Sequence, residues 1–320
     1  KEICFLLKKN DIIKYDWMFN LYLIYKEDDE DTKFLSGEKV INSKMNYNQI
    51  IAALTTTESV REQVNLTIPE GFTVDDIIDL FVKSGIGTKE GFVEAINKYP
   101  FKHEFVTLLD TNGYPATRKY RLEGYLYPDT YFFYKDTPEY LIINKMLNNF
   151  DQRFWTYYKS TFKNAIEKTG KSVDEIITLA SMIQAEARFY IDYESVSYVF
   201  WNRLNHVAAF PFLQSDATIQ YVLPKRNEDL TQEDLDLNNP YNTYVYKGLP
   251  PGAICNPGFD ALSAAIYPDA PINSNGASVN AYFFVSNKAG VTYYAETKAQ
   301  HEKNKRTVAE DNVNFEKHNN

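Results

Sequence analysis

The segment from Ser172 to Arg188 constrains the fold most, because it predicts one amphipathic helix with a carboxyl group near its C-terminal end. The segment opens with a serine followed three residues later by Glu175, which is a capping box. Apolar residues then recur at helical spacing and define a buried stripe. Leu179, Met182 and Glu186 form a second line beside that stripe. We therefore expect a helix packed in the core, with Glu186 at the edge of the apolar surface.

The position of Glu186 has a chemical consequence. Burial and the negative end of the helix dipole both disfavour its anionic form, so its pKa should be raised. A carboxyl group with a raised pKa suits general acid catalysis. The alternative is that Glu186 is a solvated helix residue. Gln184 falls within the main apolar stripe, where we expect it to form hydrogen bonds inside the core.

The N-terminal third contains an internal similarity. Residues 64–92 predict a strand, a turn and a helix capped by Thr73 with Asp76 at its third position. Residues 3–18 have a similar layout without the leading strand, which predicts that the chain begins inside a repeat. Chance similarity between amphipathic helices is the alternative. A short strand at 34–37 and a helix at 45–54 are expected between the two copies.

The remaining elements are predicted from turn residues and periodicity. Gly124 and Pro128 argue against a helix in the aromatic-rich stretch 120–133, which we expect to be a loop. Asp260 is a candidate helix cap. The other expected elements are helices at 138–168 and 194–204, a rigid loop at 239–254, a short helix ending at 266, a hairpin of 281–285 with 291–295, and a polar helix from 298.

Composition excludes several classes of function. The net charge of −9 argues against a nucleic-acid-binding protein, which should present a basic face. Two cysteines and four scattered histidines predict neither a disulfide scaffold nor a metal site. The 25 tyrosines and 21 phenylalanines suit a sugar ligand, although a bias in base composition would also explain them. No segment is long and apolar enough to span a bilayer, and no signal peptide is visible.

The order of several motifs resembles the YceG-like (MltG-type) family of endolytic murein transglycosylases. The resemblance extends over most of the chain, and the set is specific in this order although each motif alone is weak. The motifs are Leu122–Thr130 (LEGYLYPDT), Ala180–Glu186 (ASMIQAE), Val199–Leu204 (VFWNRL), Leu213–Thr218 (LQSDAT), Tyr241–Tyr244 (YNTY), Gly248–Gly252 (GLPPG), Tyr282–Val285 (YFFV) and a late His301.

The resemblance implies an α+β protein with a partial LysM-like N-terminal region, 1–60, followed by a mixed helix and strand YceG-like catalytic region, 61–320. We expect 61–120 to be a strand–helix subdomain and 121–320 to be the catalytic core. A single-pass anchor in the cell membrane is implied, with the catalytic domain on its extracytoplasmic side. Since the chain begins at Lys1 rather than Met, we expect that anchor to precede it.

The resemblance also implies cleavage of peptidoglycan glycan strands between N-acetylmuramic acid and N-acetylglucosamine, leaving 1,6-anhydromuramic ends. No metal or organic cofactor is expected. The family motif usually has two glutamates spaced two apart; here the first is Gln184, and the catalytic one corresponds to Glu186. Cell-wall synthesis proteins are partners suggested by the resemblance alone, and no nucleic acid is expected.

Further residues are candidates for binding the substrate or for supporting the site. A hydrolytic muramidase using Glu186 with Asp216, and a non-catalytic wall-binding module, remain alternative functions. For Glu123 an anchoring role is the favoured one, and Asn202 and Arg203 are expected to brace the backbone. The candidate substrate-binding residues are Gln214, Ser215, Asp216, Tyr241, Asn242, Thr243, Tyr244, Glu123 and Tyr127.

Overall fold

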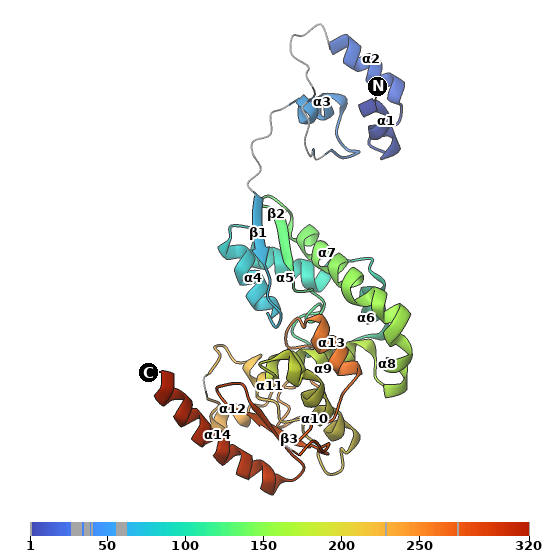
Figure 1. Ribbon diagram of the computed structural model, residues 1–320. Coiled ribbons are helices and arrows are strands. Elements are labelled where there is room, and N and C mark those ends of the chain that lie inside the picture. Colours follow the sequence, from blue (N-terminus) through green and yellow to red (C-terminus); the bar gives the residue numbers. More distant parts are fainter. Residues whose placement is uncertain are drawn as a thin grey trace. The chain divides into compact units, whose positions relative to one another are not determined.

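The computed structural model describes residues 2–26, 34, 39, 41–55, 63–227, 229–273 and 275–319. The chain forms two compact units, Lys1–Glu62 and Gln63–Asn320 (Figure 1), which are described separately below. The predicted mixture of helices and strands is confirmed in the second unit. None of the helices in the described ranges has the length and apolar character needed to cross a membrane.

The first unit is a small bundle of helices with a core of its own. It contains α1 (Glu2–Lys9), α2 (Asp16–Lys26) and α3 (Tyr47–Thr55), packed around Phe19 and Ile50. The expected helix at 45–54 corresponds to α3. The expected strand at 34–37 lies outside the described residues except for its first position. The assignment of this unit as LysM-like therefore stays a prediction.

The second unit begins with a two-stranded sheet whose partners are far apart in sequence. Strand β1 (Gln63–Thr67) pairs antiparallel with β2 (Thr130–Tyr134), placing Leu66 opposite Tyr131. The expected strand at 64–68 is confirmed. The prediction of a loop throughout 120–133 is wrong for residues 130–133, which belong to β2. Tyr131 and Phe133 are buried in the core and their neighbours are not, and this alternation forms a strand because β1 pairs with it.

In the second unit, helices follow each of the strands β1 and β2 in the sequence. The capping box of Thr73 and Asp76 is confirmed at the start of α4 (Val74–Lys83). Gly170, with a left-handed φ of 70°, follows the end of the helical stretch that was expected at 138–168. The further helices are α5 (Lys89–Lys98), α6 (Glu104–Asn112), α7 (Glu139–Phe150), two π-helical turns (Asp151–Trp155 and Tyr158–Phe162) and α8 (Lys163–Thr169).

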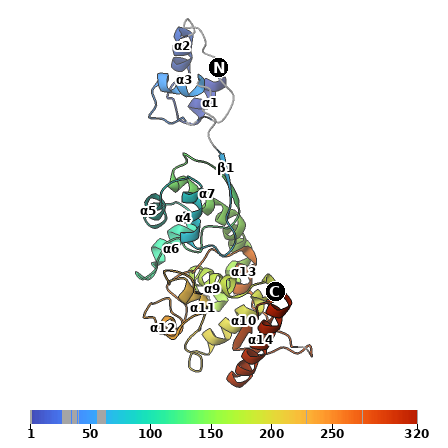
Figure 2. The ribbon, with the colours of Figure 1, turned by 90° about the vertical axis from the view of Figure 1, so that its left-hand side faces the viewer.

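The C-terminal part of this unit is built around α9 (Val173–Glu186). Helices α10 (Tyr193–Asn205), α11 (Asp216–Gln220) and α13 (Phe259–Ile266) pack against α9 (Figure 2). The expected hairpin is confirmed as β3 (Phe283–Ser286) paired with β4 (Thr292–Ala295), and both strands contact α14 (Lys298–Asn319). A 3₁₀ turn (Tyr190–Asp192) and α12 (Gln232–Leu235) complete the elements.

One buried cluster extends from β1 to α13, so it lies on both sides of the boundary predicted at 120/121. The expected cap at Asp260 is wrong, because α13 begins at Phe259 and its N-cap is Gly258, two residues earlier. The backbone N–H of Gly258 donates a hydrogen bond to the Gln184 side chain at 3.0 Å, which holds the start of α13 against α9.

Candidate active site

Glu186 is the last residue of α9. The helix starts at the predicted capping box, where Ser172 accepts from the N–H of Glu175 and the glutamate side chain accepts from the serine N–H. It ends because Ala187 takes an extended conformation, with φ −92° and ψ 125°. Glu186 therefore lies beside the unsatisfied carbonyl groups of a helix C-terminus, where a negative charge is disfavoured.

The two oxygens of the Glu186 carboxyl group have different surroundings. Oε1 accepts a hydrogen bond from Ser215 Oγ at 2.5 Å and one from the Ala217 backbone N–H at 3.3 Å. Within the described residues, no hydrogen bond reaches Oε2. Because Oε1 is occupied as an acceptor, Oε2 is the oxygen available to carry a proton.

Burial raises the pKa of Glu186 above its usual range, and the nearby charge of Asp216 raises it further. The hydrogen bonds from Ser215 and Ala217 act in the opposite direction, because they favour the carboxylate. The effect of burial on the pKa is larger than that of the hydrogen bonds, so a larger fraction of Glu186 is protonated near neutral pH than for an exposed glutamate. This is the raised pKa that the helix phase predicts.

Glu186 opens into a pocket of about 610 Å³, which we call the acid pocket. Four of the candidate residues line it, namely Glu186, Gln214, Asp216 and Tyr244. Strand β3 and helix α14 supply the facing side, including Phe283, His301, Lys298 and Lys305.

Asp216 and Tyr244 act as a pair in the acid pocket. The Tyr244 hydroxyl donates to Asp216 Oδ1 at 2.6 Å. Burial and the Asp216 carboxylate both raise the pKa of Tyr244, so its hydroxyl remains a donor at neutral pH. Asp216 is thus exposed to the pocket with one oxygen already bonded.

Gln214 has a strained backbone. Its φ of 55° lies in the left-handed region, which non-glycine residues rarely occupy. Two hydrogen bonds hold it there: its N–H donates to the Thr243 carbonyl at 3.1 Å, and Arg203 donates to its Oε1 at 3.0 Å. Strain of this kind persists where the surroundings over-determine it, which is typical of functional sites.

Tyr241, Asn242 and Thr243 lie behind the acid pocket rather than in its lining. Thr243 Oγ1 accepts from the Ser215 N–H at 2.9 Å, and so positions the serine that contacts Glu186. The Asn242 side chain donates to two backbone carbonyls of its own loop. Tyr241 accepts from the Lys119 N–H at 3.1 Å. These contacts support the loop, and substrate contact by the three residues stays a prediction.

Glu123 is fully buried and lies outside the acid pocket. It accepts from the Val74 N–H at 2.9 Å, from the Tyr221 hydroxyl at 2.9 Å and from the Asn256 amide at 3.0 Å. Burial raises its pKa to about 8. Tyr127 is half-buried and is likewise absent from the lining; burial raises its pKa to about 12. Anchoring is the role that fits Glu123.

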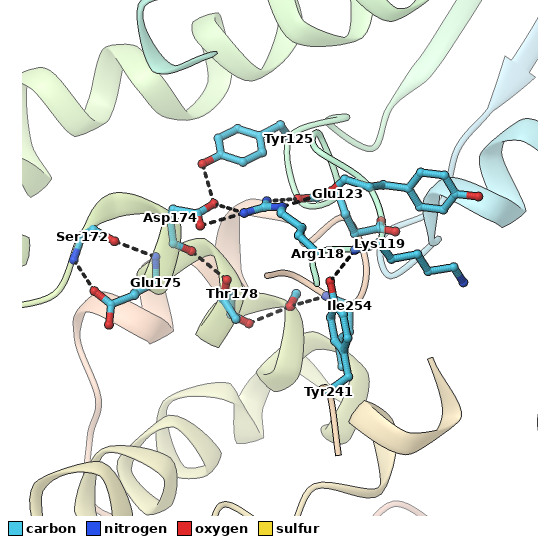
Figure 3. A network of polar contacts seen from close by, with 12 residues as sticks. Arg118, Lys119, Glu123, Tyr125, Ser172, Asp174, Glu175, Thr178, Tyr241 and Ile254 are labelled. Atoms are coloured by element: carbon cyan, nitrogen blue, oxygen red, sulfur yellow. Dashed lines mark hydrogen bonds and ion pairs between the residues drawn. The ribbon is translucent and has the colours of Figure 1, made fainter. Parts of the chain in front are cut away.

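A polar network fastens the aromatic loop to the start of α9 (Figure 3). Arg118 donates to both oxygens of Asp174 at 2.8 and 2.7 Å, and to the Glu123 carbonyl at 3.1 Å. The Tyr125 hydroxyl donates to the same carboxylate at 2.9 Å. Farther along α9, Ser181 accepts from the Ile254 N–H at 3.0 Å. These bonds fix α9, and with it the position of Glu186.

Arg203 and Asn202 brace the backbone, as expected. Arg203 is buried and donates to the carbonyls of Tyr282 and Leu213 at 2.7 and 3.0 Å, while Asn202 donates to that of Ala281 at 2.8 Å. Arg203 also lines the acid pocket, and burial lowers its pKa to about 10.

Sequence reasoning included His301 among the motifs but did not place it, or any other residue of α14, in the candidate site. Lys298, His301 and Lys305 all line the acid pocket, and His301 stacks on Phe283 with ring centroids 5.1 Å apart. Their spacing of three and four residues places them on one face of a predicted polar helix, a signal that was present in the sequence. The Ala217 N–H had no such signal, because only the fold brings it to Glu186.

Several known proteins are similar to this chain over most of its length. The model of the YceG-like family matches residues 1–307. A curated "endolytic murein transglycosylase" of Bacillus subtilis (strain 168) is 30% identical over 95% of this chain and 80% of its own length. One of Streptococcus pneumoniae (strain D39) is also 30% identical over 95% of this chain, which spans only 55% of that relative. The crystal structure of a yceG-like protein from Listeria monocytogenes matches with a TM-score of 0.60 and 30% identity, covering 94% of each chain.

Proposed function

The chain belongs to the YceG-like family, and we propose that it is an endolytic peptidoglycan lytic transglycosylase with Glu186 as its general acid and base. The relatives named endolytic murein transglycosylase support the reaction. The observation that carries the residue assignment is the asymmetry of the Glu186 carboxyl group in the acid pocket: Ser215 and Ala217 donate to its Oε1, while no hydrogen bond from the described residues reaches its Oε2.

One carboxyl group is enough for this reaction. Protonated Oε2 donates to the glycosidic oxygen that joins C1 of N-acetylmuramic acid to N-acetylglucosamine, and the C1–O bond breaks. The resulting carboxylate takes the proton from the C6 hydroxyl of the same muramic residue as its oxygen bonds to C1. The product is a 1,6-anhydro end, no water is consumed, and Glu186 regains its proton.

The surroundings of Glu186 match the two halves of the cycle. Burial and the helix C-terminus favour the protonated form that begins the reaction. The bonds from Ser215 and Ala217 stabilise the carboxylate that exists between the two proton transfers. Gln214 and the Asp216–Tyr244 pair present amide, carboxylate and hydroxyl groups for sugar hydroxyls and acetamido groups.

The proposal extends to where the protein acts. Murein lies outside the cytoplasmic membrane, so the catalytic unit works on the extracytoplasmic side. A single-pass membrane anchor and contacts with cell-wall synthesis proteins are proposed from family membership. Co-purification from membranes with a wall synthase supports the partner, and its consistent absence counts against it.

A hydrolytic muramidase is the second candidate, because Asp216 lines the same pocket as Glu186 and hydrolysis with water uses two carboxyl groups. Mass spectrometry of the products from purified peptidoglycan separates the candidates. Anhydro ends support the transglycosylase, and reducing ends alone support the muramidase. Binding to sacculi without any release supports the wall-binding module.

A further inference from the structure

A second pocket of about 610 Å³ lies next to the chain at Glu186 and Asp216. It is lined by Ala185 and Ala217, the chain neighbours of those two acids. The N-terminal half of α4 and the segment that follows α11 supply much of the remaining lining, together with Lys89, Lys119 and residues 254–255. Neither Glu186 nor Asp216 lines this second pocket, and neither alanine lines the acid pocket.

The Glu186 carboxyl group lies at the junction of the two pockets. Its Oε1 accepts from the N–H of Ala217, a residue of the second pocket. Burial raises the pKa of Glu186, and Arg226 of the second pocket opposes this increase, so its charge reaches the carboxyl group. A polymer that presents a bond to Glu186 therefore has room on both sides of it, as cleavage within a strand requires.

The second pocket differs from the acid pocket in its charge. Its lining includes four cationic and three acidic side chains: Lys89, Lys119, Lys225, Arg226, Asp75, Asp76 and Asp79. Lys119 and Asp75 pair with each other at 2.7 Å. Lys225, Arg226 and Asp79 are exposed, and the described residues include no ion-pair partner for them.

Where stems are present, the glycan backbone of peptidoglycan gives these charges no partner, because its sugars carry hydroxyl and acetamido groups and the lactyl carboxyl group of muramic acid is tied up in the amide bond to the stem. The muramic residues differ, since each can carry a short peptide stem with free carboxylates and the amino group of a diamino acid. Muramic acid is every second sugar of the strand. A stem therefore lies within one or two sugars of any bond held at Glu186.

We propose that the second pocket, which we call the stem pocket, binds the peptide stem of a muramic residue beside the scissile bond. Lys225 and Arg226 bind stem carboxylates, and Asp79 binds the stem ammonium group. Lys119 and Asp75 are paired with each other, so they line the pocket without binding the stem. This inference rests on the proposed function and adds substrate specificity to it: strands that carry stems are bound better than bare strands.

The test compares glycan strands that carry stems with strands stripped of stems by an amidase. The double variant Lys225→Ala/Arg226→Ala should lower kcat/KM on stem-bearing strands about tenfold or more, chiefly through KM, because charge-assisted hydrogen bonds are lost. On bare strands the loss should be clearly smaller, because the only carboxylate left there is the lactyl group of muramic acid. Each protein is measured at its own optimum pH, since Arg226 also lowers the pKa of Glu186. Lys98→Ala/Lys102→Ala is the matched control, since it removes two exposed lysines that line neither pocket.

Equal losses on both substrates, or no loss on stem-bearing strands, overturns the stem pocket while leaving the transglycosylase intact. If the wild type cleaves neither substrate, the proposed function itself fails. If the wild type cuts only stem-bearing strands, calorimetry with the free stem peptide decides. The double variant should then bind the peptide about tenfold more weakly, and unchanged binding overturns the proposal.

Discussion

Replacing Glu123 with glutamine should change how the stability of the protein depends on pH while leaving its activity intact. Glu123 is fully buried, and burial raises its pKa to about 8 from an ordinary value of 4.5. Because the folded pKa is the higher one, the stabilising contribution of this group is fully present below pH 4.5 and is lost as pH rises through 8. Glutamine at this position keeps one side-chain oxygen as a hydrogen-bond acceptor, but its amide group does not titrate.

The magnitude follows from proton linkage. Between its unfolded and folded pKa values, Glu123 takes up nearly one proton on folding, which lowers the unfolding free energy by up to about 1.4 kcal/mol per pH unit of increase. From about pH 5.5 to about pH 7.5 the wild type should therefore lose about 2.5 kcal/mol relative to Glu123→Gln. Other titrating groups are common to both proteins and cancel in this difference.

Urea titrations at the two pH values measure the difference. Glu90→Gln, which removes an exposed carboxyl group in α5, is the control and should show no such change. Cleavage of peptidoglycan by Glu123→Gln should stay near the wild-type rate, because Glu123 is absent from the lining of the acid pocket. A difference that does not vary with pH refutes the raised pKa, and lost activity in a folded variant refutes the anchoring role.

Two further predictions concern the contacts of the acid pocket. Ser215→Ala removes a hydrogen bond that lowers the pKa of Glu186, so the alkaline limb of the pH–rate profile should move to higher pH; an unmoved limb contradicts the assignment of that limb to Glu186. Gln214→Gly relieves a left-handed backbone and should stabilise the fold by about 1 kcal/mol in thermal unfolding while lowering kcat/KM. Unchanged kcat/KM would remove Gln214 from the substrate contacts.

Local signals were enough to predict the elements that begin with a side-chain cap. The capping boxes at Thr73 and Ser172 place the starts of α4 and α9 because all the partners lie within four residues of each other. Helical phase then places Glu186 at the end of α9, beside apolar surface. Strand β2 was missed because its evidence is nonlocal: Tyr131 and Phe133 form a strand only when β1 lies alongside.

The candidate site was predicted only in part, because some of its contacts are also nonlocal in sequence. Asp216 and Tyr244 are 28 residues apart in the sequence, with α12 between them, yet both line the acid pocket. Thr243 is buried, whereas its neighbour Tyr244 is not and lines the pocket. Burial depends on tertiary packing, so the local sequence does not predict this difference. The Ala217 N–H can be recognised only from the fold, because every residue of the chain except proline carries such a group.

The central claim is that Glu186 transfers the proton, and Glu186→Gln tests it most directly. The amide oxygen can still accept from Ser215 and Ala217, so the urea-unfolding free energy should stay close to that of the wild type, but the amide cannot supply a proton. We predict that anhydro-ended products fall at least about 100-fold, measured by mass spectrometry beside Asp216→Asn, which should retain them. Release of anhydro products by folded Glu186→Gln at the wild-type level would contradict the account and move the chemistry to Asp216, the other carboxyl group of the candidate residues that lines the acid pocket.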